Sequence, residues 1–451
     1  MKRDDLTKIN IFHYLRALRI FSQAFPSFQT MITPEDNELL CRVSGDAPMG
    51  QLMRRQWLVV CMVEEVSEPD GTPIKARILG EDLVVFRDTL GRVGVMDEYC
   101  PHRKVSLVYG RNEDCGLRCL YHGWKMDVVG NVVDMASEPQ GSGLVQKVKH
   151  KAYPVKEWAG FVWAYMGPPE HQPEFVPPVW APTDSTAVAV AKIIVPANWA
   201  QILEGQIDSA HSSSLHASDM VPARVDGAKA TDTQWLRPST DKSPRMQVER
   251  TPYGFRYAAI RRPIKDAQTH DYVRSTVFLA PASALIPPND QYNVANMNVP
   301  IDDHHTAFHF MAWGPAETTP STAAWRAFLH AEVGPDLDPQ FNPLRNHANR
   351  FGQDRAAMKA GNYTGIKGIP NQDMAMWVSM GPIVDRTNDR LGASDMAIVE
   401  FRQRMLKALQ DFMAGQIPIG TGVNAVPREV CSYQAIIPKH IDWRNHAAQP
   451  V

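Results

Sequence analysis

Four residues between positions 98 and 124 constrain this chain more than any other feature of its sequence, because together they make a metal-ligand pattern. The pattern reads C-x-H, then 16 residues, then C-x-x-H, and its members are Cys100, His102, Cys119 and His122. Each half offers one thiolate and one imidazole from a short turn. Two such turns face to face would hold a [2Fe-2S] cluster, with the cysteines on one iron and the histidines on the other.

A structural zinc site is the alternative interpretation, because two cysteines and two histidines can also close a tetrahedral shell. The C-x-H spacing is tighter than the roughly two to four residues usual between zinc-finger ligands, and no H-x3-5-H segment follows. The spacing therefore favours the cluster. Imidazole in place of thiolate raises the reduction potential of such a cluster, so it would accept electrons from a low-potential donor.

A second group of candidate ligands lies between positions 198 and 216, in NWAQILEGQIDSAHSSSLH, and comprises Glu204, Asp208, His211 and His216. Two histidines and one carboxylate on one face of a metal are how non-haem Fe(II) enzymes bind and activate oxygen. His211 and His216 would point the same way only if the helix expected over 199–216 loosens at the intervening serines. A histidine pair near a helix end more often has a structural role. Here the upstream cluster favours a metal site, because a cluster that accepts electrons needs a second centre that consumes them. The carboxylate must come from elsewhere.

Composition and length exclude several classes of protein. A chain of 451 residues is expected to form two or three domains, and a net charge of -2 does not indicate a nucleic-acid partner. The six cysteines do not suggest a disulfide framework, so the cytoplasm is the expected compartment. Residues 1–30 are interrupted by His13, Arg16 and Arg19, which argues against a signal peptide or a membrane span. This extension is expected to form a short amphipathic helix or to have no role.

Hydrophobic patterning predicts an α+β chain. Short helices near 33–55 precede an all-β run that ends near 166, with Thr33 and Asp36 spaced for an N-cap. Residues 167–182 contain six prolines, which exclude a helix or a central strand and indicate a linker. Beyond it, residues 250–313 alternate as antiparallel strands do, and residues 320–360 and 394–415 are expected to be rich in helix.

The two ligand motifs together resemble the catalytic α subunit of the Rieske non-haem iron ring-hydroxylating oxygenases. The resemblance covers residues 31–451, and three stretches are most similar to the phthalate dioxygenases among them: NELLCRVSGDAPMGQLMRRQW, EGQIDSAHSSSLH, and QDMAMWVSMGPIVDRTNDRLGASD at 372–395. It implies an N-terminal all-β Rieske domain over 31–166 and a linker over 167–182. It also implies a catalytic domain over 183–451, with a helix-flanked antiparallel sheet of the helix-grip kind.

The resemblance also implies roles for individual residues. His211, His216 and Asp373 would ligate a mononuclear Fe(II), and Q-D ahead of S-M-G-P selects Asp373. Spacing alone leaves other carboxylates open, namely Asp219, Asp385, Asp389 and Asp395. Asp208 would bridge the cluster of one subunit and the iron of its neighbour, in a trimer or a hexamer, by hydrogen-bonding a histidine ligand on each side.

An aromatic dicarboxylate substrate needs multiply donating or cationic partners, and the planar fork of arginine suits a carboxylate well. Seven arginines between 230 and 280 are candidates. The resemblance to phthalate dioxygenases selects Arg237 and Arg274, with Ser209 beside the iron motif, as the substrate-binding residues.

The expected function is therefore that of an oxygenase component which uses O2 to convert phthalate to its cis-4,5-dihydrodiol. Electrons would come from NADH through a separate flavin and iron-sulfur reductase, because the chain has no G-x-G-x-x-G before a helix and no second ferredoxin-type cysteine cluster. Two alternatives remain open: a Rieske monooxygenase or O-demethylase acting on another aromatic carboxylate, and a non-catalytic Rieske electron carrier.

Overall fold

The computed structural model describes residues 32–139, 141–222, 235–287 and 292–446. The expectations for residues 1–30 lie outside this part of the chain. Within it, no helix combines the length and the apolar character that a membrane span requires.

The N-terminal part consists of two short helices and three small antiparallel sheets. Thr33 Oγ1 accepts the backbone N–H of Asp36 at 3.1 Å and so caps α2 (Pro34–Cys41), which α3 (Pro48–Met53) follows. One sheet has the order β1 (Trp57–Met62), β10 (Phe161–Tyr165), β9 (Val155–Trp158). The second has the order β2 (Ile74–Ile78), β3 (Glu81–Arg87), β4 (Val93–Asp97). The third has the order β5 (Arg111–Glu113), β6 (Gly116–Arg118), β7 (Trp124–Met126), β8 (Val132–Met135).

The proline-rich segment after β10 is irregular apart from one 3-10 turn at Pro169–His171. Its far end is anchored by the buried Trp180, whose ring lies 5.7 Å from that of Phe161 and 6.3 Å from that of Trp163. The linker therefore packs on the N-terminal strands.

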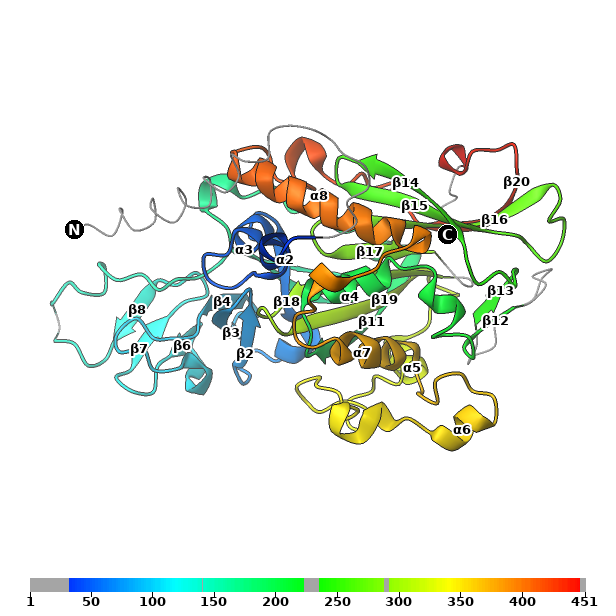
Figure 1. Cartoon of the computed structure of the whole chain (residues 1–451). Helices are drawn as coiled ribbons and strands as arrows, with labels where there is room; N and C mark the ends of the chain where they lie inside the picture. The colour runs from blue at the N-terminus through cyan, green and yellow to red at the C-terminus, as the bar shows by residue number, and fades with distance from the viewer. Residues whose placement is uncertain (1–31, 140, 223–234, 288–291, 447–451) are drawn as a thin grey trace.

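A large antiparallel sheet forms the centre of the C-terminal part (Figure 1). Its order is β11 (Thr186–Val195), β19 (Thr306–Pro315), β18 (Asn293–Pro300), β17 (Ser283–Ile286), β16 (His270–Leu279), β15 (Gly254–Arg261), β14 (Arg245–Thr251), and β20 (Tyr433–Pro438) also pairs with β16. A small parallel pair, β12 (Met220–Pro222) and β13 (Trp235–Arg237), lies beside it. The alternation predicted over 250–313 is thus realised as strands, and the α+β prediction is confirmed.

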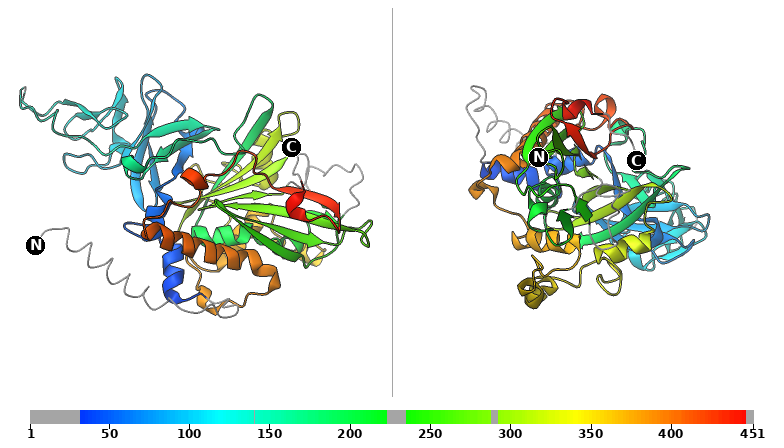
Figure 2. Two further views of the ribbon diagram at one scale, coloured as in Figure 1. Left: turned by 90° about the horizontal axis from the view of Figure 1, so that it is seen from above. Right: turned by 90° about the vertical axis from the view of Figure 1, so that its right-hand side faces the viewer.

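Helices flank this sheet. They are α4 (Trp199–Gln206), α5 (Thr322–Leu329), α7 (Ile369–Ser379) and α8 (Met396–Met413). The short helix α6 (Arg355–Lys359) lies away from the sheet (Figure 1). The long helix α8 runs across the sheet, and strands β6 to β8 lie at one end of the molecule, away from α4 and α7 (Figures 1 and 2).

Two helix predictions were too long. The helix expected over 199–216 ends at Gln206, because Asp208 Oδ1 accepts the backbone N–H of Ala210 at 2.8 Å and turns the chain. The region 320–360 holds only α5, the short α6 and 3-10 turns, since Pro335, Pro339 and Pro343 interrupt it.

Candidate functional site

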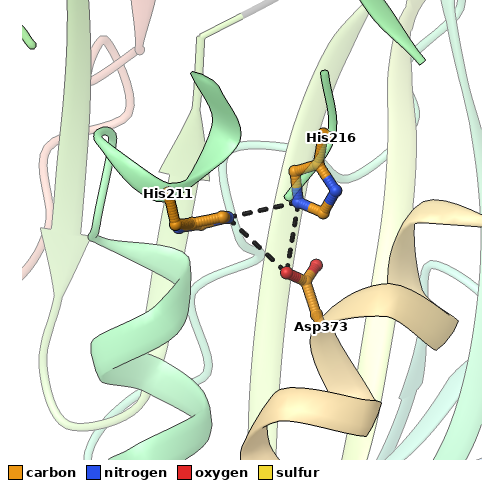
Figure 3. A group of neighbouring side chains, drawn as sticks. All are labelled: His211, His216 and Asp373. Atoms are coloured by element: carbon orange, nitrogen blue, oxygen red, sulfur yellow. Dashed lines mark hydrogen bonds and ion pairs between the residues drawn. The ribbon is translucent and has the colours of Figure 1, made fainter. Parts of the chain in front are cut away.

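Two histidines and one carboxylate meet beside the C-terminal sheet. His211 lies in a 3-10 turn (His211–Ser213) just after α4, His216 lies in the loop that follows, and Asp373 comes from α7 (Figure 3). The Nε2 atoms of His211 and His216 are 3.2 Å apart, and Asp373 Oδ1 is 3.5 Å from the first and 3.1 Å from the second. The three atoms therefore point at one common position, although Asp373 is distant in the sequence.

Hydrogen bonds fix the orientation of His216. Its Nδ1 lies 2.7 Å from Gln372 Oε1, and Gln372 Nε2 donates to Asp219 Oδ2 and to the backbone oxygen of Ile366, each at 2.8 Å. Because Nε2 of Gln372 donates to two acceptors, the amide is oriented with Oε1 toward the imidazole of His216. Oε1 can only accept a hydrogen bond, so Nδ1 of His216 carries the proton. Nε2 of His216 is then free to ligate a metal.

Asp208 orients the other histidine. Its Oδ2 lies 3.6 Å from His211 Nδ1, while its Oδ1 accepts the N–H groups of Ala210 and His211. Burial alone would raise the pKa of Asp208, but the hydrogen bond and charge of His211 outweigh it and lower the pKa. Asp208 thus stays anionic and holds His211 with Nε2 toward Asp373.

The donor set fits a non-haem iron. Two imidazole nitrogens and one carboxylate oxygen converge from one side, which leaves other coordination positions open. The remaining downstream carboxylates have other tasks: Asp219 holds Gln372, Asp389 pairs with Arg402, and Asp385 and Asp395 accept backbone N–H groups nearby.

The N-terminal motif also forms one site. Cys100 and His102 lie in the turn after β4, and Cys119 and His122 lie between β6 and β7. The two imidazole rings are 4.4 Å apart, both cysteines are buried, and the thiols interact with each other. His102 Nδ1 is buried and has no hydrogen-bond partner among the described residues, as expected of an atom that awaits a metal. These side chains fit a [2Fe-2S] cluster held by two cysteines and two histidines.

A pocket adjoins the histidine and aspartate group. One face of the sheet forms its floor, which changes from polar to apolar across the strands. Arg274 and Thr276 of β16 lie at the polar side, and Phe308 and Phe310 of β19 at the apolar side. Such a floor suits a molecule that is charged at one end and aromatic at the other.

Three buried arginines gather at the polar end, namely Arg237, Arg261 and Arg274, each less than 7% exposed. Arg237 donates to the hydroxyls of Ser212 and Ser213, and Arg261 donates to the backbone oxygen of Ser209 and the hydroxyl of Ser213. Neither Arg237 nor Arg261 makes an ion pair within the described part of the chain, and each has one buried N–H without a partner there.

Positive charge therefore accumulates around the loop that carries the two histidines. Burial, and then the charges of Arg261 and Arg274, lower the pKa of Arg237 to about 9. Burial, and then Arg274, lower the pKa of Arg261 to about 10. Both side chains remain charged at neutral pH, so this end of the pocket attracts an anion.

The structure places the predicted substrate-binding residues differently. Ser209 and Arg274 line the pocket, and Ser209 Oγ lies 3.0 Å from the hydroxyl of Tyr257. Arg237 lies behind the loop, on Ser212 and Ser213.

Arg261 was not selected from the sequence. Successive residues of a strand face opposite sides of the sheet, so one of the adjacent residues Arg261 and Arg262 is expected to be buried, but the sequence does not show which one. The side chain of its neighbour Arg262 is 75% exposed and pairs with Asp241.

Comparison with known proteins identifies the two domains that carry these sites. The family model described as Rieske [2Fe-2S] domain matches residues 56–154, and the model described as LigXa C-terminal domain like matches residues 164–451. The phthalate 4,5-dioxygenase oxygenase subunit of Pseudomonas putida is 70% identical over 93% of this chain and 96% of its own length. The 3-chlorobenzoate-3,4-dioxygenase oxygenase subunit of Comamonas testosteroni is 36% identical over 93% of this chain and 99% of its own.

Solved structures show the same fold at low sequence identity. NdmB of Pseudomonas putida CBB5 superimposes with a TM-score of 0.57 at 17% identity, covering 86% of this chain and 97% of that one. The reduced complex between oxygenase and ferredoxin in carbazole 1,9a-dioxygenase gives 0.52 at 19% identity, covering 86% and 99%.

Proposed function

This chain belongs to the Rieske non-haem iron oxygenases, and from that premise we propose that it is the oxygenase component of a phthalate 4,5-dioxygenase. The observation that carries the proposal is the buried cationic end of the pocket, a few side chains away from the histidine and aspartate group. The similarity to the P. putida phthalate 4,5-dioxygenase subunit supports the same substrate.

The pocket matches a phthalate dianion in its distribution of charged and apolar groups. The two carboxylates lie toward Arg274 and Ser209, in the field of Arg237 and Arg261. The ring lies on Phe308 and Phe310, where apolar contact excludes water. Attraction between the substrate carboxylates and the arginines fixes which ring carbons face His211, His216 and Asp373. Binding of the carboxylate edge of the ring thus determines which carbons are attacked at the opposite edge.

The reaction adds both atoms of O2 to neighbouring ring carbons, and it takes up two electrons and two protons, which convert the two oxygen atoms to hydroxyl groups. Held by His211, His216 and Asp373, Fe(II) would supply the reductive activation of dioxygen. Gln372 and Asp208 hold the two imidazole rings in fixed orientations, so that the ligand set does not rearrange when substrate binds.

The electrons would enter through a cluster held by Cys100, His102, Cys119 and His122. We expect them to come from NADH through a separate reductase, and to cross between the subunits of a homotrimer or hexamer by way of Asp208. In the chain itself, strands β6 to β8 lie away from α4 and α7, which favours a route through a neighbouring subunit (Figures 1 and 2).

Oxygen isotope labelling tests this function. The enzyme, loaded with cluster and iron and chemically reduced, should convert phthalate under 18O2 to a cis-4,5-dihydrodiol with two labelled atoms per molecule. Chemical reduction makes the result independent of the reductase. A product with one labelled atom would indicate monooxygenation instead, and phthalate left unchanged by a fully loaded enzyme would refute the substrate.

A further inference from the structure

Asn296 is a buried amide in the wall of the pocket. It lies in the middle of β18, is 5% exposed, and lines the same pocket as His211, His216 and Asp373. Its side-chain oxygen is buried and has no hydrogen-bond partner among the described residues. A buried carbonyl left unpaired destabilises a fold, so such a group usually has a partner that the protein alone does not supply.

The surroundings of Asn296 are apolar. Phe310 is its register partner on β19, and Phe308, Val294 and Ile286 line the pocket around it. Arg261 and Arg274 are on β15 and β16, on the other side of β17. Asn296 therefore faces the end of the pocket where the ring lies, and an apolar residue in its place would pack on a ring equally well.

Phthalate offers nothing to this amide at that end, because the ring edge remote from its carboxylates carries only C–H groups. The cis-dihydrodiol offers two hydroxyl groups on that edge. A hydroxyl can donate to the orphaned oxygen, and this hydrogen bond becomes available only as the new C–O and O–H bonds form. Interactions of this kind favour the transition state over the bound reactant.

We propose that Asn296 is a specificity-determining residue that hydrogen-bonds a hydroxyl group of the dihydrodiol product. The inference rests on the proposed function and adds to it a residue at the end of the pocket opposite to the arginines. It predicts that Asn296 contributes to turnover and to product affinity, and that it contributes nothing to phthalate affinity.

Two substitutions on the same strand test this. Asn296→Leu keeps the size and removes the amide, and Asn293→Leu is the matched control. Asn293 is also a buried asparagine of β18 whose side-chain oxygen has no partner among the described residues. It lies three residues before Asn296, so its side chain is on the opposite face of the sheet.

In Asn296→Leu we expect the dissociation constant of phthalate to change by less than about twofold, while kcat falls and the inhibition constant of purified dihydrodiol rises, each by about tenfold. Asn293→Leu should change none of the three.

Equal weakening of phthalate and dihydrodiol would overturn the inference, since the amide would then act on the carboxylates or on pocket shape. Unchanged dihydrodiol inhibition would overturn it as well. If Asn296→Leu does not fold, Asn296→Ala is expected to give the same pattern. If the wild-type enzyme does not oxidise phthalate, the proposed function is refuted. If the wild-type enzyme oxidises phthalate and the Asn296→Leu variant binds the dihydrodiol normally, only the role of Asn296 is refuted.

Discussion

At the scale of single residues, the buried charges of this protein fall into two groups. Glu204 is paired with Arg386 and Arg402, so its charge is compensated within the fold. Arg237 and Arg261 are held by hydroxyl and carbonyl oxygens, which satisfy hydrogen bonds and leave the charge uncompensated. The first group stabilises the structure, and the second prepares it for an anionic ligand.

The adjacent pair Arg261 and Arg262 allows a controlled test of that distinction. Arg261→Gln should raise the KM for phthalate by roughly tenfold, about 1.4 kcal/mol, because a buried positive charge near the dianion is lost. Arg262→Gln removes the same charge from a side chain that is 75% exposed, so KM should stay within about twofold. Steady-state kinetics on both variants provide the comparison, and equal effects would contradict a specific role for Arg261.

A second residue-scale prediction concerns Gln372, the hydrogen-bond partner of His216. Gln372→Leu should weaken iron binding by about 10- to 100-fold, because Nδ1 of His216 loses its acceptor and the ring its fixed orientation. Iron content and Fe(II) titration of the metal-depleted enzyme would measure this. Gln353→Leu, which removes an amide that within the described ranges bonds only to the backbone of Thr364, should bind iron normally. The spectrum of the [2Fe-2S] cluster should be unchanged in both.

At the scale of secondary structure, α4 determines where the loop that carries His211 and His216 begins. Asn198 caps the N-terminus of α4 by accepting the N–H of Ala200 at 3.0 Å. Glu204, near the C-terminal end of the helix, accepts hydrogen bonds from Arg386 and Arg402 at 2.9 and 2.8 Å and so holds the helix in place. Burial alone would raise the pKa of Glu204, but the two arginines lower it below its ordinary value. Its contribution to stability is therefore present above the pKa of the unfolded chain and is lost as pH falls through the lower folded value.

Glu204→Gln should lower the free energy of unfolding by roughly 3–5 kcal/mol, because it leaves the buried guanidinium group of Arg386 without an ion-pair partner among the described residues, while Arg402 keeps only Asp389. Glu400→Gln, which breaks a pair with the largely exposed Arg250, should cost less than about 1 kcal/mol. Denaturant unfolding of the two variants decides between them. Similar losses would mean that the Glu204 network contributes no more than an exposed ion pair.

The sequence predicted the elements that carry a local signal. Strands β15 and β16 contain several aromatic and β-branched residues, which favour strands. The motif C-x-H with C-x-x-H already contains all four of its ligands. Helix α7, which carries Asp373, was not predicted, because it is buried on most sides and so lacks an amphipathic period. Asp373 itself could be selected only through family resemblance, since its approach to His211 and His216 is a tertiary contact.

At the scale of the whole molecule, two groups of candidate metal ligands lie in separate parts of one chain. The strands that carry the cluster motif lie at one end, and α4 and α7 lie beside the large sheet (Figures 1 and 2). In a cyclic oligomer the cluster end of each subunit would lie against the next subunit. Across every interface, the cluster of one subunit would then donate electrons to the iron site of its neighbour. Electron transfer would then depend on assembly as well as on both metal sites.

Complementation between two inactive variants tests this arrangement most directly. Cys100→Ser would lack the cluster but keep the iron site, and His211→Ala would lack the iron site but keep the cluster. If electrons cross between neighbouring chains, mixed oligomers purified through two different tags should regain about one third of wild-type phthalate oxidation in a trimer, because every mixed trimer has a single intact iron site that adjoins an intact cluster, and about one quarter in a hexamer. Mixed oligomers that stay as inactive as the separate variants would contradict the transfer of electrons between subunits.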